Sequence, residues 1–205
     1  MRATKLQTEI RQEQIAQAAL DLVATHGLKG LSVARVARQV GLVPSAIYRH
    51  FRSKDDVLNA ILGLIQDRLR DNAEAVRRET ADPLEQLRRL LLRHGRLVGE
   101  YQAIPRLLFS EEVYSGHPER KAKVYRIISS YLQRVGEIVR QGQRQGCIRA
   151  DVAPNTMAVM FVGLVQPAAI LWHMSDGGFD VTTHIEQAWR LYSAAIRAKE
   201  SPAVG

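Results

Sequence analysis

The segment from Leu31 to Leu58 constrains the fold of this chain more than any other part of the sequence. It reads LSVARVARQVGLVPSAIYRHFRSKDDVL. Ala37 is small enough to let two helices cross closely, and Gly41, four residues later, can take a left-handed backbone conformation at low steric cost. Ile47 then returns a branched apolar side chain to the crossing. This spacing predicts a helix-turn-helix, a motif whose second helix enters the major groove of DNA.

The residues that follow the motif indicate where its helices begin. We expect the second helix to cover residues 44–50. Val43 has no side-chain oxygen to cap it, so Pro44 must set its start. Ser53 and Asp56 then fit a capping box, which predicts a long helix from Lys54 to about residue 80.

Basic charge is concentrated around this motif. Residues 1–54 contain nine Lys or Arg and three acids, so they carry +6 of the net charge of +8. A surface that binds a polyanion needs such a concentration, although a solvated basic face is the ordinary alternative.

The whole chain is predicted to be all-α, with about nine helices, because strand signals are nearly absent and Gly and Pro fall between segments with helical period. We expect a DNA-binding domain at residues 1–54 and an effector-binding and dimerisation domain at residues 55–205, joined by the shared helix 54–80. Two of the predicted helices, at residues 155–175 and from residue 184 onward, close the chain.

The N-terminal region resembles the TetR family of bacterial regulators. The resemblance covers roughly residues 9–60 in motif detail and is carried by Thr25-His26-Gly27, Leu31-Ser32-Val33, Val36-Ala37, Gly41 and the run from Ile47 to Leu58. It implies a sequence-specific, DNA-binding transcriptional regulator. The expected regulator is a repressor that leaves its operator when an apolar small-molecule effector binds.

Eight residues are candidates for DNA contact, from their chemistry and from this resemblance. The phosphate candidates are Ser32, Tyr48, His50 and Lys54, and the base candidates are Arg35, Ser45, Ala46 and Arg49. Core packing is the alternative for Tyr48 and for Phe51, and a solvated charge is the alternative for Arg49. Because Val43 and Ala46 replace residues that are commonly polar in the family, base preference cannot be carried over.

The helix at residues 155–175 is apolar nearly all round, so it must be covered on every face. We therefore predict a homodimer through the last two helices, as in the TetR family. A twofold dimer places two recognition helices about 34 Å apart and predicts a palindromic operator on double-stranded DNA.

An effector pocket is implied by the family resemblance, among the helices of the second domain. The candidate lining residues are His94, Tyr101, Phe109, Tyr125, Ser129, Phe161, Gln166 and Trp172. Ordinary core or dimer packing is the alternative for each. Pro167 leaves the carbonyl of Gly163 without its helical donor, which predicts a kink or an opening for a ligand.

Other classes of function find little support in the sequence. The six histidines form no i, i+4 pair and no ligand cluster with the single cysteine, and no Gly-rich phosphate loop or nucleophile elbow occurs. We expect no enzyme activity, no cofactor, no metal site and no membrane span, and a cytoplasmic, nucleoid-associated protein. An architectural or nucleoid-binding dimer without an effector is the alternative function.

Overall fold

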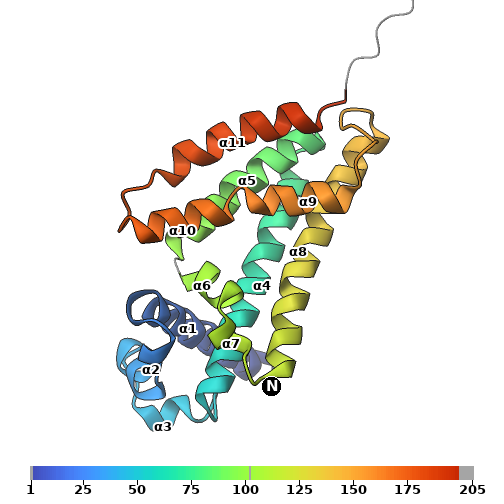
Figure 1. Cartoon of the computed structure of the whole chain (residues 1–205). Helices are drawn as coiled ribbons and strands as arrows, with labels where there is room; N and C mark the ends of the chain where they lie inside the picture. The colour runs from blue at the N-terminus through green and yellow to red at the C-terminus, as the bar shows by residue number, and fades with distance from the viewer. Residues whose placement is uncertain (1, 102, 199–205) are drawn as a thin grey trace, which may run out of the picture. The chain divides into compact units, whose positions relative to one another are not determined.

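The structure is a computed structural model that describes residues 2–101 and 103–198. Within these residues it contains eleven α-helices and one 3₁₀ helix, together with a single isolated bridge between Ile148 and Arg197 (Figure 1). The all-α prediction is confirmed. The chain forms two compact units: unit 1 comprises Met1–Arg68 and Tyr101–Tyr125, and unit 2 comprises Leu69–Glu100 and Arg126–Gly205.

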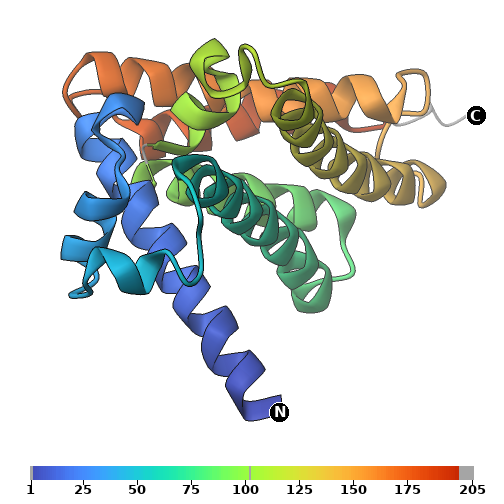
Figure 2. The same cartoon turned by 90° about the horizontal axis from the view of Figure 1, so that it is seen from below.

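Unit 1 contains the predicted helix-turn-helix. Its elements are α1 (Arg2–His26), the 3₁₀ helix η1 (Leu28–Gly30), α2 (Val33–Gln39), α3 (Pro44–Ile47), α6 (Ala103–Phe109), α7 (Glu111–Tyr114) and the first parts of α4 (Lys54–Glu79) and α8 (Pro118–Arg144). α2 packs against both α1 and α3, and α1 also packs against α6. The first turns of α1 extend away from the neighbouring helices of the unit (Figure 2), and residues 7–11 are exposed.

The turn between α2 and α3 has the conformation that the sequence predicts. Gly41 has φ +68°, the N–H of Leu42 donates to the carbonyl of Ala37 at 2.8 Å, and the N–H of Gly41 donates to Arg38 at 3.3 Å. These two bonds make a Schellman cap, which satisfies carbonyls at the end of α2. Ala37 and Ile47 are fully buried, so the helix crossing is closed by the residues expected to close it.

Unit 2 is built around α5 (Pro83–Glu100), which packs against α11 (Val181–Ile196). Its other elements are α9 (Pro154–Gly163), α10 (Gln166–Met174) and the remaining parts of α4 and α8. At Gly95, α5 and α11 approach so closely that an added Cβ would lie 2.0 Å from Cδ1 of Ile185. A glycine is therefore required for this packing unless the Ile185 side chain moves.

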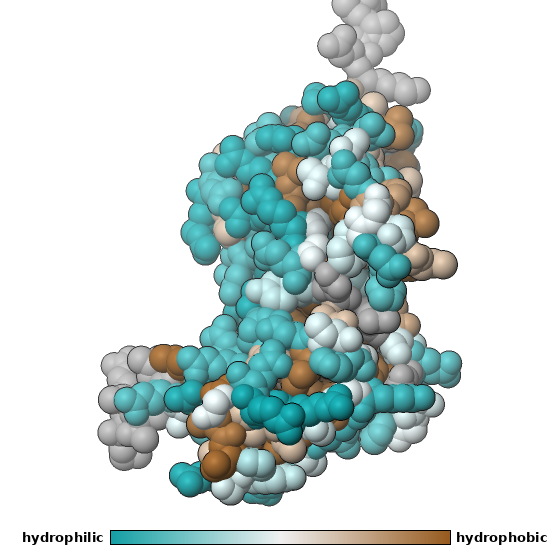
Figure 3. All heavy atoms as spheres, turned by 90° about the vertical axis from the view of Figure 1, so that its left-hand side faces the viewer, coloured by the Kyte–Doolittle hydropathy of each residue, from teal (hydrophilic) through white to brown (hydrophobic). Residues whose placement is uncertain are grey.

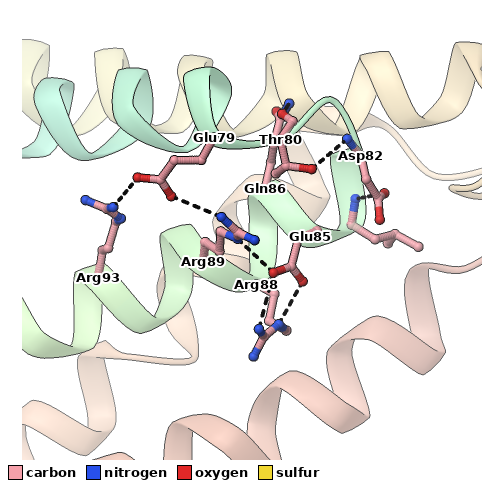
Figure 4. A network of polar contacts seen from close by, with 9 residues as sticks. Glu79, Thr80, Asp82, Glu85, Gln86, Arg88, Arg89 and Arg93 are labelled. Carbon is pink, nitrogen blue, oxygen red and sulfur yellow. Dashed lines mark hydrogen bonds and ion pairs between the residues drawn. The ribbon is translucent and has the colours of Figure 1, made fainter.

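A network of ion pairs joins the end of α4 to the start of α5 (Figure 4). Glu79 pairs with Arg89 and Arg93, while Glu85 accepts hydrogen bonds from Arg88 and Arg89 at 2.8 Å each. The hydrogen bonds from Arg88 and Arg89 lower the pKa of Glu85 to about 2. The two ion pairs of Glu79 therefore link the end of α4 to α5 across the turn.

The helix predicted at residues 155–175 is divided into α9 and α10. The break falls at Leu164 and Val165, and Pro167 occupies the first turn of α10, where a missing N–H leaves no helical hydrogen bond unmade. The kink predicted from Pro167 is therefore a complete interruption. Residues Pro154–Met174 are also long and apolar enough to cross a membrane by composition, a weak signal that core helices share.

Candidate DNA-binding interface

α3 and the turn after it present the candidate base contacts. Pro44 sits in the first turn of α3 and Val43 gives no side-chain cap, as expected. Ser45 and Arg49 are exposed, and Ala46 is half-buried. The helix ends at Ile47, earlier than the predicted residue 50, because residues 48–50 continue as a hydrogen-bonded turn.

Two aromatic residues at this turn, Tyr48 and Phe51, differ in their exposure to solvent. Tyr48 is 53% exposed, whereas Phe51 is 5% exposed and packs in the core. Core packing is therefore the role of Phe51 but not of Tyr48, whose phenol reaches solvent. His50 is half-buried, and its backbone N–H donates to the carbonyl of Ile47 at 2.8 Å.

The first turn of α4 is held in place by three separate bonds. Ser53 Oγ accepts from the N–H of Asp56 at 3.1 Å, and Asp56 Oδ2 accepts from the N–H of Arg52 at 2.8 Å. The predicted capping box is present, with the carboxylate reaching one residue further back than in the standard arrangement. Lys54 Nζ donates to the carbonyl of Leu28 at 2.8 Å. This helix start therefore presents an ammonium and helical N–H groups together, which favours an anion.

Ser32 and Arg35 are already engaged within the protein. Ser32 Oγ accepts from the N–H of Arg35 at 3.3 Å and caps α2, which leaves the hydroxyl hydrogen free to donate to another group. Arg35 Nη1 donates to the carbonyl of Gly30 at 3.3 Å. The remaining guanidinium donors stay available on an exposed side chain.

All eight DNA-contact candidates lie in unit 1, and none is buried. The surface of unit 1 around α2 and α3, at the bottom of Figure 1, is largely hydrophilic, with apolar side chains among the polar ones (Figure 3). Sequence reasoning did not single out the exposed Lys29, Arg38 and Arg52 of the same region. The concentration of basic charge in residues 1–54 was the signal that could have identified them.

The structure distributes the effector candidates over both units. Tyr101, Phe109 and Tyr125 belong to unit 1. Phe109 is 49% exposed and Tyr125 is 72% exposed, so in this structure both side chains face solvent. Tyr101 accepts a hydrogen bond from Arg68 at 2.8 Å.

The other five effector candidates belong to unit 2: His94, Ser129, Phe161, Gln166 and Trp172. His94 Nδ1 and the Tyr131 hydroxyl are 3.2 Å apart, with the rings edge to face, so the imidazole has a polar partner within unit 2. Burial lowers the pKa of His94 to about 4. Phe161 is fully buried against Tyr192, which is a packing role, and Ser129 and Gln166 are half-buried.

Trp172 borders a groove that sequence reasoning missed. The groove has a volume of about 660 Å³ and lies beside α5, the end of α10 and the start of α11. Apolar and charged side chains share its lining, among them Phe179, Ile185, Arg96 and Glu100. Its walls come from two distant segments, residues 92–100 and 172–186, so no local pattern in the sequence indicates it. Among the described residues, no three His, Cys, Asp or Glu side chains are grouped to hold a metal ion.

Comparison with known proteins identifies the family. The model described as "Bacterial regulatory proteins, tetR family" matches residues 15–61, and that of the "Tetracyclin repressor-like, C-terminal domain" matches residues 80–196. The chain belongs to the TetR family. This TetR-family chain is therefore a DNA-binding transcriptional regulator, and not an enzyme.

Two curated proteins resemble the TetR-family chain over nearly its full length. The fatty acid metabolism regulator protein of Bacillus subtilis (strain 168) is 23% identical over 187 residues, covering 91% of this chain and 95% of that protein. The nucleoid occlusion factor SlmA of Vibrio atlanticus (strain LGP32) is 26% identical over 200 residues, covering 91% and 96%. Bacillus subtilis FadR, solved in complex with stearoyl-CoA, has the same fold, with a TM-score of 0.74, 22% identity and coverage of 89% and 98%.

Proposed function

We propose that this protein is a homodimeric repressor that leaves a palindromic operator when an apolar small-molecule effector binds. The observation that carries the DNA-binding surface is the junction of α3 and α4. There the exposed Tyr48 and Arg49 precede a helix start at which Lys54 is fixed by the Leu28 carbonyl. A fixed cation beside free helical N–H groups suits a phosphate of the DNA backbone.

The eight candidates divide into two roles. Ser32, Tyr48, His50 and Lys54 donate to phosphate oxygens and set the position of the protein on the duplex. Arg35, Ser45, Ala46 and Arg49 face the bases in the major groove, where a guanidinium addresses guanine and a methyl group meets the thymine methyl. The functional boundary accordingly lies at residues 54 and 55, within the first turn of α4.

The dimer forms through α9, α10 and α11. Large apolar side chains remain exposed along these helices: Val159, Met160, Ile170, Leu171, Met174 and Leu191. Their exposed fractions run from 47% to 77%, so a second copy would remove substantial apolar area from water. Twofold symmetry then supports a palindromic operator with half-sites about 34 Å apart.

The effector is a molecule of the acyl-thioester class, with an apolar acyl chain, bound in unit 2. Two names support this class, since the Bacillus subtilis relative is a fatty acid metabolism regulator and Bacillus subtilis FadR was solved with stearoyl-CoA. His94 is our candidate for the polar group that orients such a ligand, because it lies on α5 together with the buried Leu87, Leu91 and Val98. We place the protein in the cytoplasm, on the nucleoid.

The second candidate function is a nucleoid-binding dimer that needs no effector. The similarity to the nucleoid occlusion factor SlmA favours it. The two candidates share the DNA surface and the dimer, and they differ only in the response to ligand.

Genomic footprinting of the purified full-length protein tests both candidates. We expect protection of a palindrome, and release on addition of stearoyl-CoA or a shorter acyl-CoA. Free coenzyme A, which lacks the apolar acyl chain, is the matched control and should not release the DNA. Protection that no acyl-CoA alters favours the nucleoid-binding candidate, and protection of no palindrome contradicts the repressor.

A further inference from the structure

Four side chains of unit 1 form a continuous chain of hydrogen bonds centred on Arg68 of α4. Arg68 Nη1 donates to the Tyr101 hydroxyl at 2.8 Å, and Nη2 donates to Gln17 Oε1 at 2.7 Å. Gln17 Nε2 in turn donates to Asp21 Oδ1 at 2.9 Å. The guanidinium carbon also lies 4.4 Å from the centre of the Tyr101 ring. We call Asp21, Gln17, Arg68 and Tyr101 the Arg68 relay.

Arg68 occupies a position at which a cation is costly. It lies between the buried Ile65 and Leu69 on α4, and its Nε is buried without a hydrogen bond to any residue that the structure describes. A partly desolvated guanidinium is tolerated when its other donors make charge-assisted hydrogen bonds. The bonds to Gln17 and Tyr101 are therefore the contacts that stabilise it, and their loss leaves a partly buried cation without these hydrogen bonds.

The relay also sits where the chain passes between its two units. Arg68 is the last residue of α4 in unit 1, and Tyr101 is the first residue after α5. The chain passes from one unit to the other after residues 68, 100 and 125. The hydrogen bond from Arg68 to Tyr101 therefore links residues at the first two of these positions. Through Gln17 the same guanidinium reaches α1, the helix that packs against α2 of the helix-turn-helix.

The surroundings leave the relay room to rearrange. A hollow of about 480 Å³ lies beside it, lined by residues of α1, by Gln39 of α2 and by Arg68 itself. Side chains in a close-packed core are held by their neighbours on every side, whereas here hydrogen bonds hold the arrangement. A change at either chain crossing can therefore alter the bonds to α1 without repacking a core.

We propose that Arg68 is a positioning residue that sets α1, and with it the helix-turn-helix, in the arrangement that binds DNA. The inference rests on the proposed DNA-binding function. It adds the hydrogen bonds through which Arg68 of α4 and Tyr101 position α1 and the helix-turn-helix. Loss of the relay leaves α1 held by its apolar contacts alone, so its position is less well defined and affinity for DNA falls roughly fivefold. Arg68 itself touches no phosphate in this proposal.

The test compares four variants of the full-length protein in titrations of an operator fragment at several salt concentrations. Arg68→Met, Gln17→Met and Tyr101→Phe each remove relay hydrogen bonds, and the last preserves the ring and the net charge. Arg70→Met is the matched control, since it removes an arginine of the same helix that bonds to its neighbour Asp71. We expect roughly fivefold weaker binding for the three relay variants and unchanged affinity for the Arg70→Met control.

The slope of affinity against salt distinguishes positioning from contact. A residue that neutralises one phosphate changes the slope by about one unit, so a positioning residue leaves it unchanged. The double variant Arg68→Met/Tyr101→Phe should bind no more weakly than Arg68→Met alone, because both remove the same bond. A changed slope, additive losses, or wild-type affinity in both Arg68→Met and Tyr101→Phe overturns the proposal.

Hydrogen exchange separates failure of the relay from failure of the proposed function. We expect faster amide exchange along residues 14–21 of α1 in the relay variants and unchanged exchange in Arg70→Met. If the wild-type protein protects no DNA, the proposed function fails, and this exchange still decides the relay. Unchanged exchange along α1 in all relay variants overturns it.

Discussion

The ammonium of Lys54 donates a 2.8 Å hydrogen bond to the carbonyl of Leu28, which lies 26 residues earlier in the chain. This bond ties the start of α4 to the 3₁₀ helix that follows α1. An ammonium has three donors, so two remain for a phosphate oxygen while the bond to Leu28 persists. Lys54 is therefore held in position before DNA arrives, and little side-chain entropy remains to be lost on binding.

Replacing Lys54 by Ala should weaken binding to all DNA sequences and reduce the salt slope by about one unit, since one phosphate contact is lost. Titration of operator and unrelated DNA at several salt concentrations measures both quantities. Lys121→Ala is the matched control, because Lys121 is an exposed lysine of α8 and is not a proposed contact. Lost sequence preference with unchanged affinity would contradict the phosphate role of Lys54.

The turn glycine of the helix-turn-helix gives a prediction about stability. Gly41 has φ +68°, and an added Cβ there would meet no atom within 4 Å, so the penalty for alanine is backbone strain alone. We expect Gly41→Ala to lower the free energy of unfolding by about 1 kcal/mol or more. Gly63→Ala, inside α4 and equally open, should instead raise it by about 0.5–1 kcal/mol.

Urea unfolding of the two variants measures the contrast. Equal effects of both substitutions would show that the left-handed conformation of Gly41 carries no penalty for a side chain. That outcome would contradict the Schellman cap as the reason for the glycine.

The sequence predicts the helix-turn-helix well because its determinants are local. Ala37, Gly41 and Ile47 act within ten residues of one another, and backbone conformation, burial and hydrogen bonds all agree with the prediction. The Ser53 cap is likewise a local pattern. Such features depend on spacing that can be read directly from the chain.

Two features of the structure were not predicted. The predicted start of the last helix at residue 184 is wrong: the helix begins at Val181, because the carboxylate of Asp180 caps it by accepting from the N–H and the hydroxyl of Thr183. The bond from Arg68 to Gln17 spans 51 residues, although a cation within the apolar stripe of α4 was a signal that could have indicated it.

The proposed dimer surface gives a prediction about oligomeric state. Leu191 of α11 is 77% exposed, and a carboxylate there would be buried without a partner in the dimer. We expect Leu191→Asp to be monomeric in sedimentation experiments and to lose most of its affinity for a palindrome. Ile10→Asp, at an exposed apolar residue of α1, should remain dimeric. Dimers of Leu191→Asp as stable as wild type would contradict the use of α11.

The His94–Tyr131 pair gives a prediction about pH. Burial lowers the pKa of His94 from its ordinary 6.5 to about 4, so the folded protein favours the neutral ring. Between these two values the unfolded chain binds more protons than the folded one, and stability therefore rises with pH. The contribution of His94 is fully present above pH 6.5 and is lost as the pH falls toward 4, by at most about 3 kcal/mol.

Urea unfolding of wild type and His94→Gln across pH 4 to 8 isolates this contribution. Glutamine keeps an acceptor for the Tyr131 hydroxyl and does not titrate, so the difference between the two proteins cancels the other ionisable groups. We expect the wild type to lose stability relative to the variant as the pH falls from 6.5 to 4. His173→Gln, at an exposed histidine, should follow the wild type. Parallel curves for wild type and His94→Gln would mean that the His94 ring is charged as readily in the fold as in the unfolded chain.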